Sequence, residues 1–102
     1  MSEIVYDFQW DGVKALSNAS KHGVTFEQAA SVFLDPLALT VFDEAHSQRE
    51  ERWWLLGYDS NGVLLLVAHT YQPTGPTSVS VRLISARPAT KQEQRFYENE
   101  PR

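Results

Sequence analysis

The 102-residue sequence predicts a single α+β domain, in which helices pack on an antiparallel sheet. Two segments, Thr25–Gln28 and Thr90–Glu93, have the T-x-x-Q or T-x-x-E pattern of a capping box, which marks the first turn of a helix. After Pro36 the spacing of apolar residues changes from the period of a helix to the period of two that is typical of strands. An Asn61-Gly62 pair then separates two apolar runs, which indicates a hairpin.

The first part of the chain predicts a short strand and two helices. Residues 4–8 are rich in β-branched and aromatic side chains and predict the strand. A helix is expected over about 12–21, with Asp11 as its N-cap and Gly23 just past its end. The second helix has one apolar face, made by Phe26, Ala29, Ala30 and Phe33. It ends at Asp35, because a residue before proline avoids the α conformation.

The second part predicts four strands and a closing helix. The strands are expected to form an antiparallel meander over residues 37–43, 51–59, 63–71 and 78–86. Segment 72–77 is rich in proline and glycine and predicts a loop, and the closing helix runs to about Asn99. Trp53 and Trp54 are neighbours on one strand, so one is expected in the core and the other outward, where a partner protein could contact it.

Composition limits the classes of function. The chain has no cysteine, so neither a disulfide nor a zinc–thiolate site is possible. The longest apolar run, 63–68, has the length of a strand, and the acidic N-terminus does not resemble a signal peptide. These features predict a soluble, cytoplasmic protein that makes no membrane contact. The net charge of −4 argues against a large nucleic-acid footprint, although a local arginine cluster can still bind phosphate.

No metal or cofactor site is predicted. Motifs for nucleotide phosphates, serine hydrolases and zinc proteases are absent, and His22, His46 and His69 lie too far apart in sequence to have ligand spacing.

Three polar clusters are candidates for chemistry. Lys21 and His22 stand at the end of the first helix, where positive side chains also suit the helix dipole, and that structural role is the simpler interpretation. The run 43–52 holds His46, Arg49 and Arg52 among acidic residues, and a solvated loop is again the simpler interpretation.

The third cluster surrounds the end of the last strand. Arg82 lies mid-strand on the polar face, and Arg87 comes where the strand ends, near the free N–H groups of the closing helix, where anions are favoured. The alternative is that Arg87 pairs with Glu93 or another acidic residue to hold this helix. The helix also carries Lys91, Arg95 and Tyr97.

Together these groups suggest a metal-free ribonuclease. RNA cleavage needs a base for the 2′-OH proton, cations for the charged phosphorane and an acid for the leaving 5′ oxygen. Histidine is a common donor or acceptor of protons in enzymes, so His22 suits either proton transfer. Arg82, Arg87 and Lys21 would stabilise charge, and Glu93 or Tyr97 would assist proton transfer.

Four motifs, in order, resemble the BrnT family of small bacterial toxins. They are K-H-G-[VI]-x-F-E-x-A at 21–29, D-P at 35–36, H-S-x-x-E-E-R at 46–52 and [RI]-[LI]-I-S-A-R-x-A at 82–89. The resemblance covers about residues 7–98. It implies a RelE-like α+β fold and a type II toxin that cleaves RNA and arrests growth without metal or cofactor. The implied partner is a BrnA-like antitoxin whose ribbon-helix-helix region binds operator DNA, so that the toxin meets that DNA only indirectly.

The resemblance also implies site residues. K-H-G matches 21–23, E-E-R matches 50–52, I-S-A-R matches 84–87, and E-x-x-x-Y matches 93–97. The expected catalytic residues are His22, Arg82, Arg87, Glu93 and Tyr97. The residues expected to bind RNA phosphates are Lys21, Arg52, Gln72, Lys91 and Arg95.

One position departs from the family pattern. Many members carry an arginine in a T-x-R sequence, whereas this chain has Thr70-Tyr71-Gln72. Gln72 can donate a hydrogen bond to a phosphate but cannot neutralise it. This departure supports an alternative function, in which a weakened toxin acts mainly as an antitoxin-binding module in operon autoregulation.

Overall fold

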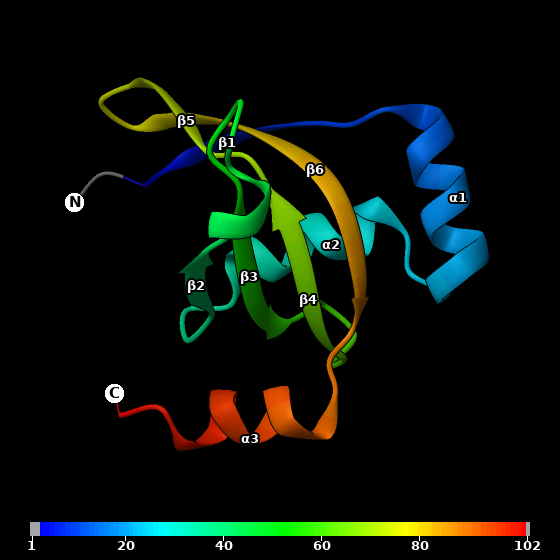
Figure 1. The fold of residues 1–102 in the computed structure, drawn as a ribbon. Coiled ribbons are helices and arrows are strands. Elements are labelled where there is room, and N and C mark those ends of the chain that lie inside the picture. Colours follow the sequence, from blue (N-terminus) through cyan, green and yellow to red (C-terminus); the bar gives the residue numbers. More distant parts are fainter. Residues whose placement is uncertain (1–2, 102) are drawn as a thin grey trace.

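The computed structural model describes residues 3–101, which form a mixed six-stranded sheet and three α-helices (Figure 1). The strands are β1 (Val5–Gln9), β2 (Leu39–Phe42), β3 (Trp53–Tyr58), β4 (Leu64–His69), β5 (Gln72–Gly75) and β6 (Ser78–Pro88). The helices are α1 (Gly12–His22), α2 (Phe26–Ser31) and α3 (Lys91–Asn99), with 3₁₀ turns η1 (Val32–Leu34) and η2 (Glu44–His46). None of the described helices has the length and apolar character needed to cross a membrane.

The sheet confirms the predicted meander and extends it. Strands β2, β3, β4 and β6 are antiparallel neighbours, and β1 adds to the far side of β6 in parallel. The predicted loop over 72–77 is wrong, because Gln72–Gly75 forms β5 and pairs antiparallel with β6. Pro73 is compatible with this strand because β5 is exposed along its length, where a missing N–H donor is tolerated.

The helices cover the sheet unequally. Helices α1 and α2 pack on one face of the sheet, and the core lies between them and the strands (Figure 1). Its most deeply buried side chains include Phe26, Ala29, Val32, Leu65, Val67, Val81 and Leu83. Helix α3 instead crosses near the ends of β3 and β4, where Tyr97 is buried against Tyr58 and donates a hydrogen bond to Asp35 Oδ2 at 2.7 Å. The opposite face of the sheet, which we call the outer face, carries neither α1 nor α2.

The predicted helix ends and turns are confirmed. Asp11 accepts hydrogen bonds from the N–H groups of Val13 and Lys14, and Gly23 follows α1 in the left-handed conformation with φ 69°. Both capping boxes have their reciprocal hydrogen bonds, one at Thr25 and one at Thr90. Gly62 has φ 79° in the turn between β3 and β4, as its hairpin requires.

The adjacent tryptophans point to opposite faces, as predicted. Trp53 faces the helix side, where it pairs with His69, and Trp54 lies on the outer face beside Leu56 and Leu66. Both indoles are only partly buried.

A bulge in β6 brings its two arginines to the same face. Ser85 pairs with Ala68 and Leu83 pairs with His69, so Ile84 is an extra residue without a partner in β4. In a regular strand Arg82 and Arg87 would point to opposite faces, because they are an odd number of residues apart. The bulge shifts this alternation by one residue, and both arginines therefore lie on the outer side.

Asn18 fixes α1 against the edge of β6. Its side-chain amide donates to the carbonyl of Ala86 at 2.9 Å and accepts from the Ala86 N–H at 3.0 Å, in the manner of a neighbouring strand. The same amide donates to the Val24 carbonyl at 2.9 Å, and Asn18 is 6% exposed. The last turn of α1, with Lys21 and His22, is thereby held beside β6.

Candidate functional site

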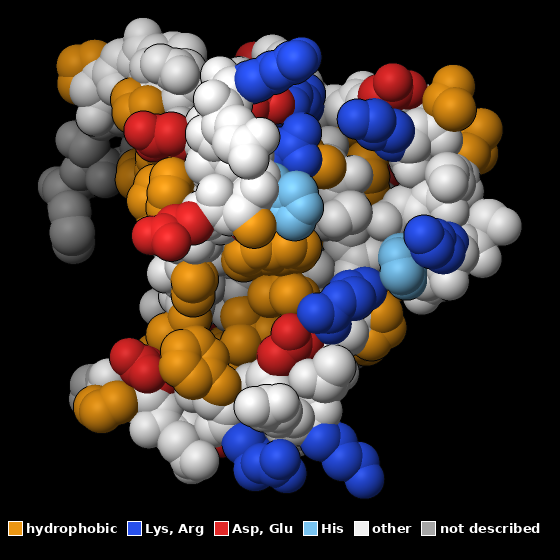
Figure 2. All heavy atoms as spheres, viewed as in Figure 1, with side chains coloured by type: hydrophobic (Ala, Val, Ile, Leu, Met, Phe, Trp, Pro, Cys, Tyr) orange, Lys and Arg blue, Asp and Glu red, His pale blue; other side chains and the backbone are white. Residues whose placement is uncertain are grey.

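A groove rich in cations lies between α1, the 43–52 segment and β6. We call it the basic groove, and its volume is about 510 Å³. Its lining includes the basic residues Lys14, His46, Arg49, Arg52 and Arg82, together with Glu50. Figure 2 shows Lys, Arg and His side chains gathered along this side of the molecule. The groove thus gathers four Lys and Arg side chains in a protein whose net charge is −4.

Glu50 holds two of the guanidinium groups. The Arg82 guanidinium pairs with both carboxylate oxygens, at 3.1 Å from Nη1 to Oε2 and by a close contact from Nη2 to Oε1. Arg52 Nη2 lies 3.7 Å from Glu50 Oε1. The hydrogen bond from Arg82 holds the pKa of Glu50 below its ordinary value, so Glu50 is ionised at neutral pH. Arg52 Nε is buried and has no hydrogen-bond partner within residues 3–101.

His46 is oriented by an acidic neighbour. Its Nδ1 lies 3.0 Å from Asp43 Oδ2 and 3.2 Å from Asp43 Oδ1, and Asp43 is only 7% exposed. A carboxylate in this position favours the tautomer with the proton on Nδ1, which leaves Nε2 free to accept one. The imidazole itself is 61% exposed and is therefore open to a ligand in the groove.

Lys21 and His22 line a smaller hollow next to the basic groove. This hollow has a volume of about 180 Å³, and its other lining residues include Lys14, Ile84 and Ser85. Lys14 lines both cavities, so the two are adjacent at this residue of α1. Lys21 and His22 also form the basic last turn of α1, so the simpler structural interpretation and a role in the site are compatible.

Arg87 does not line the basic groove. Its guanidinium makes two hydrogen bonds of 2.9 Å with Glu93, which is the contact expected if Arg87 holds α3 in place. This pairing lowers the pKa of Glu93 and raises the pKa of Arg87. Both side chains lie at the rim of an apolar hollow on the outer face and not in the groove.

The remaining predicted residues divide between the groove and α3. Gln72 lines a cleft of about 680 Å³ that shares Arg49, Glu50 and Arg82 with the basic groove. Lys91 and Arg95 are exposed on α3, outside the groove. Tyr97 is 7% exposed, with its hydroxyl bonded to Asp35.

Sequence reasoning missed Lys14 and gave little weight to His46 and Arg49. A signal for Lys14 was present, because Lys14, Ser17, Asn18 and Lys21 recur at i, i+3, i+4 and i+7 and form one polar face of α1. His46 also had a signal, because it is the first residue of the H-S-x-x-E-E-R motif. Arg49 stands at a variable position of that motif, and its segment meets α1 only in the folded chain.

The outer face of the sheet carries an apolar groove. Its lining includes Leu39, Val41, Trp54, Leu56, Leu66 and Phe96, which define it here, and its volume is about 320 Å³. Val41 is 47% exposed and Phe96 is 50% exposed. Figure 2 shows hydrophobic side chains gathered in a hollow above α3.

No metal-binding cluster occurs in the described part of the chain: groups of three or more His, Asp or Glu side chains in ligand positions are absent from residues 3–101.

Comparisons with known proteins agree with the motifs. A family model described as "Ribonuclease toxin, BrnT, of type II toxin-antitoxin system" matches residues 10–93. The crystal structure of the Brucella abortus ribonuclease toxin BrnT is similar, with 25% sequence identity and a TM-score of 0.56 over 89% of this chain and 100% of that chain. No curated protein sequence matches. The chain therefore belongs to the BrnT family of ribonuclease toxins of type II toxin–antitoxin systems.

Proposed function

We propose that this chain, as a single domain, is a cytoplasmic toxin that cleaves RNA and inhibits growth, using protein side chains without a metal. The basic groove would hold the scissile phosphate. The observation that carries the proposal is the Asp43-oriented imidazole of His46 in the same groove as Arg52 and Arg82. A positioned base beside fixed cations is what phosphodiester cleavage requires.

In the proposed mechanism His46 Nε2 removes the proton from the ribose 2′-OH. The 2′ oxygen then attacks phosphorus, and the bond from phosphorus to the 5′ oxygen breaks, which leaves a 2′,3′-cyclic phosphate. Arg52, Arg82 and Lys14 stabilise the extra negative charge of the phosphorane. His22, in the adjoining hollow, donates a proton to the leaving 5′ oxygen, and Lys21 contacts a neighbouring phosphate.

Purified protein with end-labelled RNA tests this proposal. We expect cleavage in the presence of excess EDTA at the same rate as in its absence, with cyclic phosphate at the new 3′ ends. Replacing His46 with asparagine is expected to slow cleavage by about 100-fold or more, since general base catalysis contributes about 10² to 10⁴. Loss of cleavage in EDTA that Mg²⁺ restores would contradict the metal-free mechanism.

A second candidate function is a weakened toxin that serves mainly in operon autoregulation. Two observations favour it: Gln72 lacks the charge of an arginine, and Arg82 and Arg87 are each paired with a glutamate. A soluble parent protein that cleaves no RNA and does not slow growth when it is induced alone would support this second function.

We also propose that a BrnA-like antitoxin, with a ribbon-helix-helix region that binds operator DNA, neutralises the toxin by covering the apolar groove. Membership of a toxin–antitoxin family supplies the partner. Exposed Val41 and Phe96 suit apolar side chains of an amphipathic antitoxin segment. The ion pair of Arg87 and Glu93 at the rim would satisfy polar groups at the edge of that segment.

Replacing Val41 with aspartate is expected to weaken antitoxin binding by about tenfold or more, because a charge would be buried without a partner. Thr74→Asp is the matched control, since it adds the same charge to an exposed strand away from the apolar groove. Calorimetric titration with purified antitoxin measures the affinity of each variant. Equal affinities for the two variants would place the antitoxin elsewhere.

A further inference from the structure

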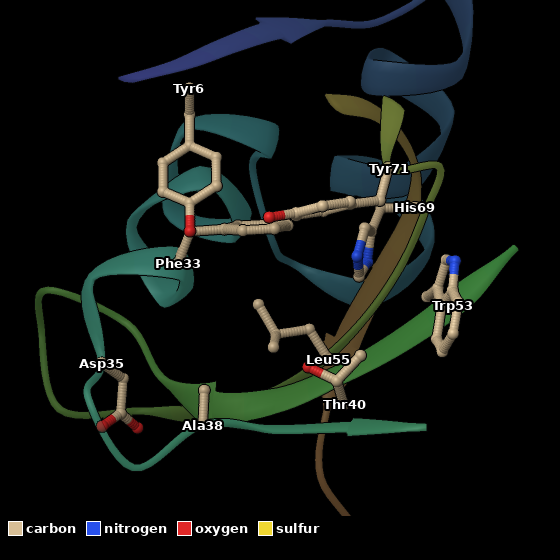
Figure 3. Close-up of a pocket in the computed structure, with 9 residues that line it drawn as sticks. All are labelled: Tyr6, Phe33, Asp35, Ala38, Thr40, Trp53, Leu55, His69 and Tyr71. Atoms are coloured by element: carbon tan, nitrogen blue, oxygen red, sulfur yellow. The ribbon is translucent and has the colours of Figure 1, made fainter. Parts of the chain in front are cut away.

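A second pocket lies on the helix side of the sheet, separate from the basic groove. We call it the aromatic pocket, and its volume is about 380 Å³. Its walls are largely aromatic and are formed by Tyr6, Phe33, Trp53, His69 and Tyr71. Figure 3 shows the rings of Tyr6, Phe33 and Tyr71 over the open space, with His69 and Trp53 along one side and Leu55 and Thr40 at the floor. This size and this mixture of aromatic walls with a few polar groups are typical of sites that bind a planar molecule.

The walls are held by ring contacts. Phe33 packs against Tyr6 with centroids 5.4 Å apart and against the His69 ring with centroids 4.9 Å apart at an interplanar angle of 79°. These rings come from β1, η1 and β4, so three elements fix the pocket. The pocket is therefore formed in advance of any ligand.

His69 supplies a polar group at the back of the pocket. It is 1% exposed, and burial lowers its pKa to about 4, so the imidazole is neutral at pH 7. Its Nδ1 lies 3.4 Å from the Val67 carbonyl, which favours a proton on Nδ1 and leaves Nε2 as an acceptor. The hydroxyls of Tyr6 and Tyr71 add groups that can donate or accept.

Tyr71 lies between the aromatic pocket and the cleft that adjoins the basic groove. Tyr71 lines both the pocket and the neighbouring cleft that contains Gln72, Arg49 and Arg82. That cleft in turn shares Arg49 and Arg82 with the basic groove. An RNA whose phosphates lie in the groove would have to pass Tyr71 to place a base in the pocket.

We propose that the aromatic pocket binds one nucleobase of the RNA whose phosphates occupy the basic groove, an inference that rests on the proposed function. Proteins read single-stranded RNA by stacking unpaired bases on aromatic rings and by hydrogen bonds to base edges. Phosphate contacts position an RNA but carry no sequence information, so a base pocket gives this toxin its choice of cleavage position. His69 Nε2 and the tyrosine hydroxyls would read the edge of the base.

Filling the pocket tests the inference. Thr40 is an exposed residue on β2 whose side chain lies at the pocket floor, and phenylalanine at this position suits a strand. The probes are an uncleavable 2′-O-methyl RNA oligonucleotide and the same backbone with abasic sites. We expect Thr40→Phe to raise the Kd for the base-containing oligonucleotide about tenfold, within the range for one lost base stack. The abasic oligonucleotide should bind the parent and the variant equally, and Thr74→Phe on β5 should bind both probes like the parent.

Tyr71→Leu is a second variant, should Thr40→Phe fail to fold, because Tyr71 is 38% exposed and contributes little to the core. It is expected to cause the same loss and to change the positions at which a long RNA is cut. If both variants bind the base-containing oligonucleotide like the parent and cut the same positions, the base pocket is wrong while the ribonuclease proposal stands. A parent that binds neither probe and cuts no RNA overturns both. Loss of antitoxin binding alone would make the pocket a receptor for an aromatic side chain of a protein and would overturn the base assignment.

Discussion

Replacing Arg82 with alanine is expected to slow RNA cleavage by about 100-fold or more, the usual cost of removing one charged donor from a phosphorane. The Ile84 bulge turns Arg82 to the outer side, where its side chain is 43% exposed and lies in the basic groove. The fold should be unaffected, because an exposed ion pair contributes little to stability. Initial rates at one fixed salt concentration give kcat/KM, since cation contacts to phosphate weaken as salt rises.

Two further variants separate the role of Arg82 from general charge effects. Arg95→Ala removes the same charge from α3, outside the groove, and should cleave within about twofold of the parent. Glu50→Gln removes the carboxylate that pairs with Arg82 and Arg52, so RNA should bind more tightly. If Arg82→Ala keeps the kcat/KM of the parent, the basic groove is not the site. If Arg95→Ala loses as much kcat/KM as Arg82→Ala, the loss is an effect of net charge and not of the position of Arg82.

Local sequence signals predicted most of the fold because each depends on a few neighbouring residues. A capping box needs only Thr25 and Gln28, and its reciprocal hydrogen bonds are present. The alternation of Val79, Val81 and Leu83 predicted a strand with one buried side, which is observed. Strand β5 was missed because its Pro and Gly residues favour a loop locally, whereas its pairing with β6 is a tertiary interaction.

The candidate site was less predictable because it depends on contacts between distant segments. Arg82 and Glu50 are 32 residues apart in sequence, and they meet only because the fold places the 43–52 segment beside β6. The shared face of Arg82 and Arg87 depends on the bulge at Ile84, which no alternation of apolar residues reveals. Tyr97 could be placed in a family motif from the sequence. The motif did not indicate whether the Tyr97 hydroxyl would face the groove or Asp35, and in the structure it bonds to Asp35.

Lowering the pH from 7 to 4.5 is expected to reduce the free energy of unfolding by about 2.5 kcal/mol through His69 alone. Burial lowers the pKa of this imidazole from 6.5 to about 4, so the unfolded chain binds a proton in this range while the folded chain does not. Stability is therefore complete above pH 6.5 and is lost as the pH falls toward 4. The carboxyl groups of Glu50 and Glu93 have pKa values lowered from 4.5, so their losses begin near pH 4.5 and fall mainly below this range.

The groups that face His69 allow this effect to be isolated. Tyr6, Tyr71 and Asp35 line the same pocket, and tyrosines do not titrate in acid. His69→Gln should make the urea-derived free energy nearly independent of pH between 7 and 4.5, whereas the matched change His22→Gln at the end of α1 should keep the full slope. NMR titration of the parent protein tests the lowered pKa of His69 without a variant, because the His69 ring should remain neutral at pH 5. A His69 resonance that titrates near 6.5 would mean that water reaches the ring. The aromatic pocket would then be too open to hold a nucleobase against the His69 ring.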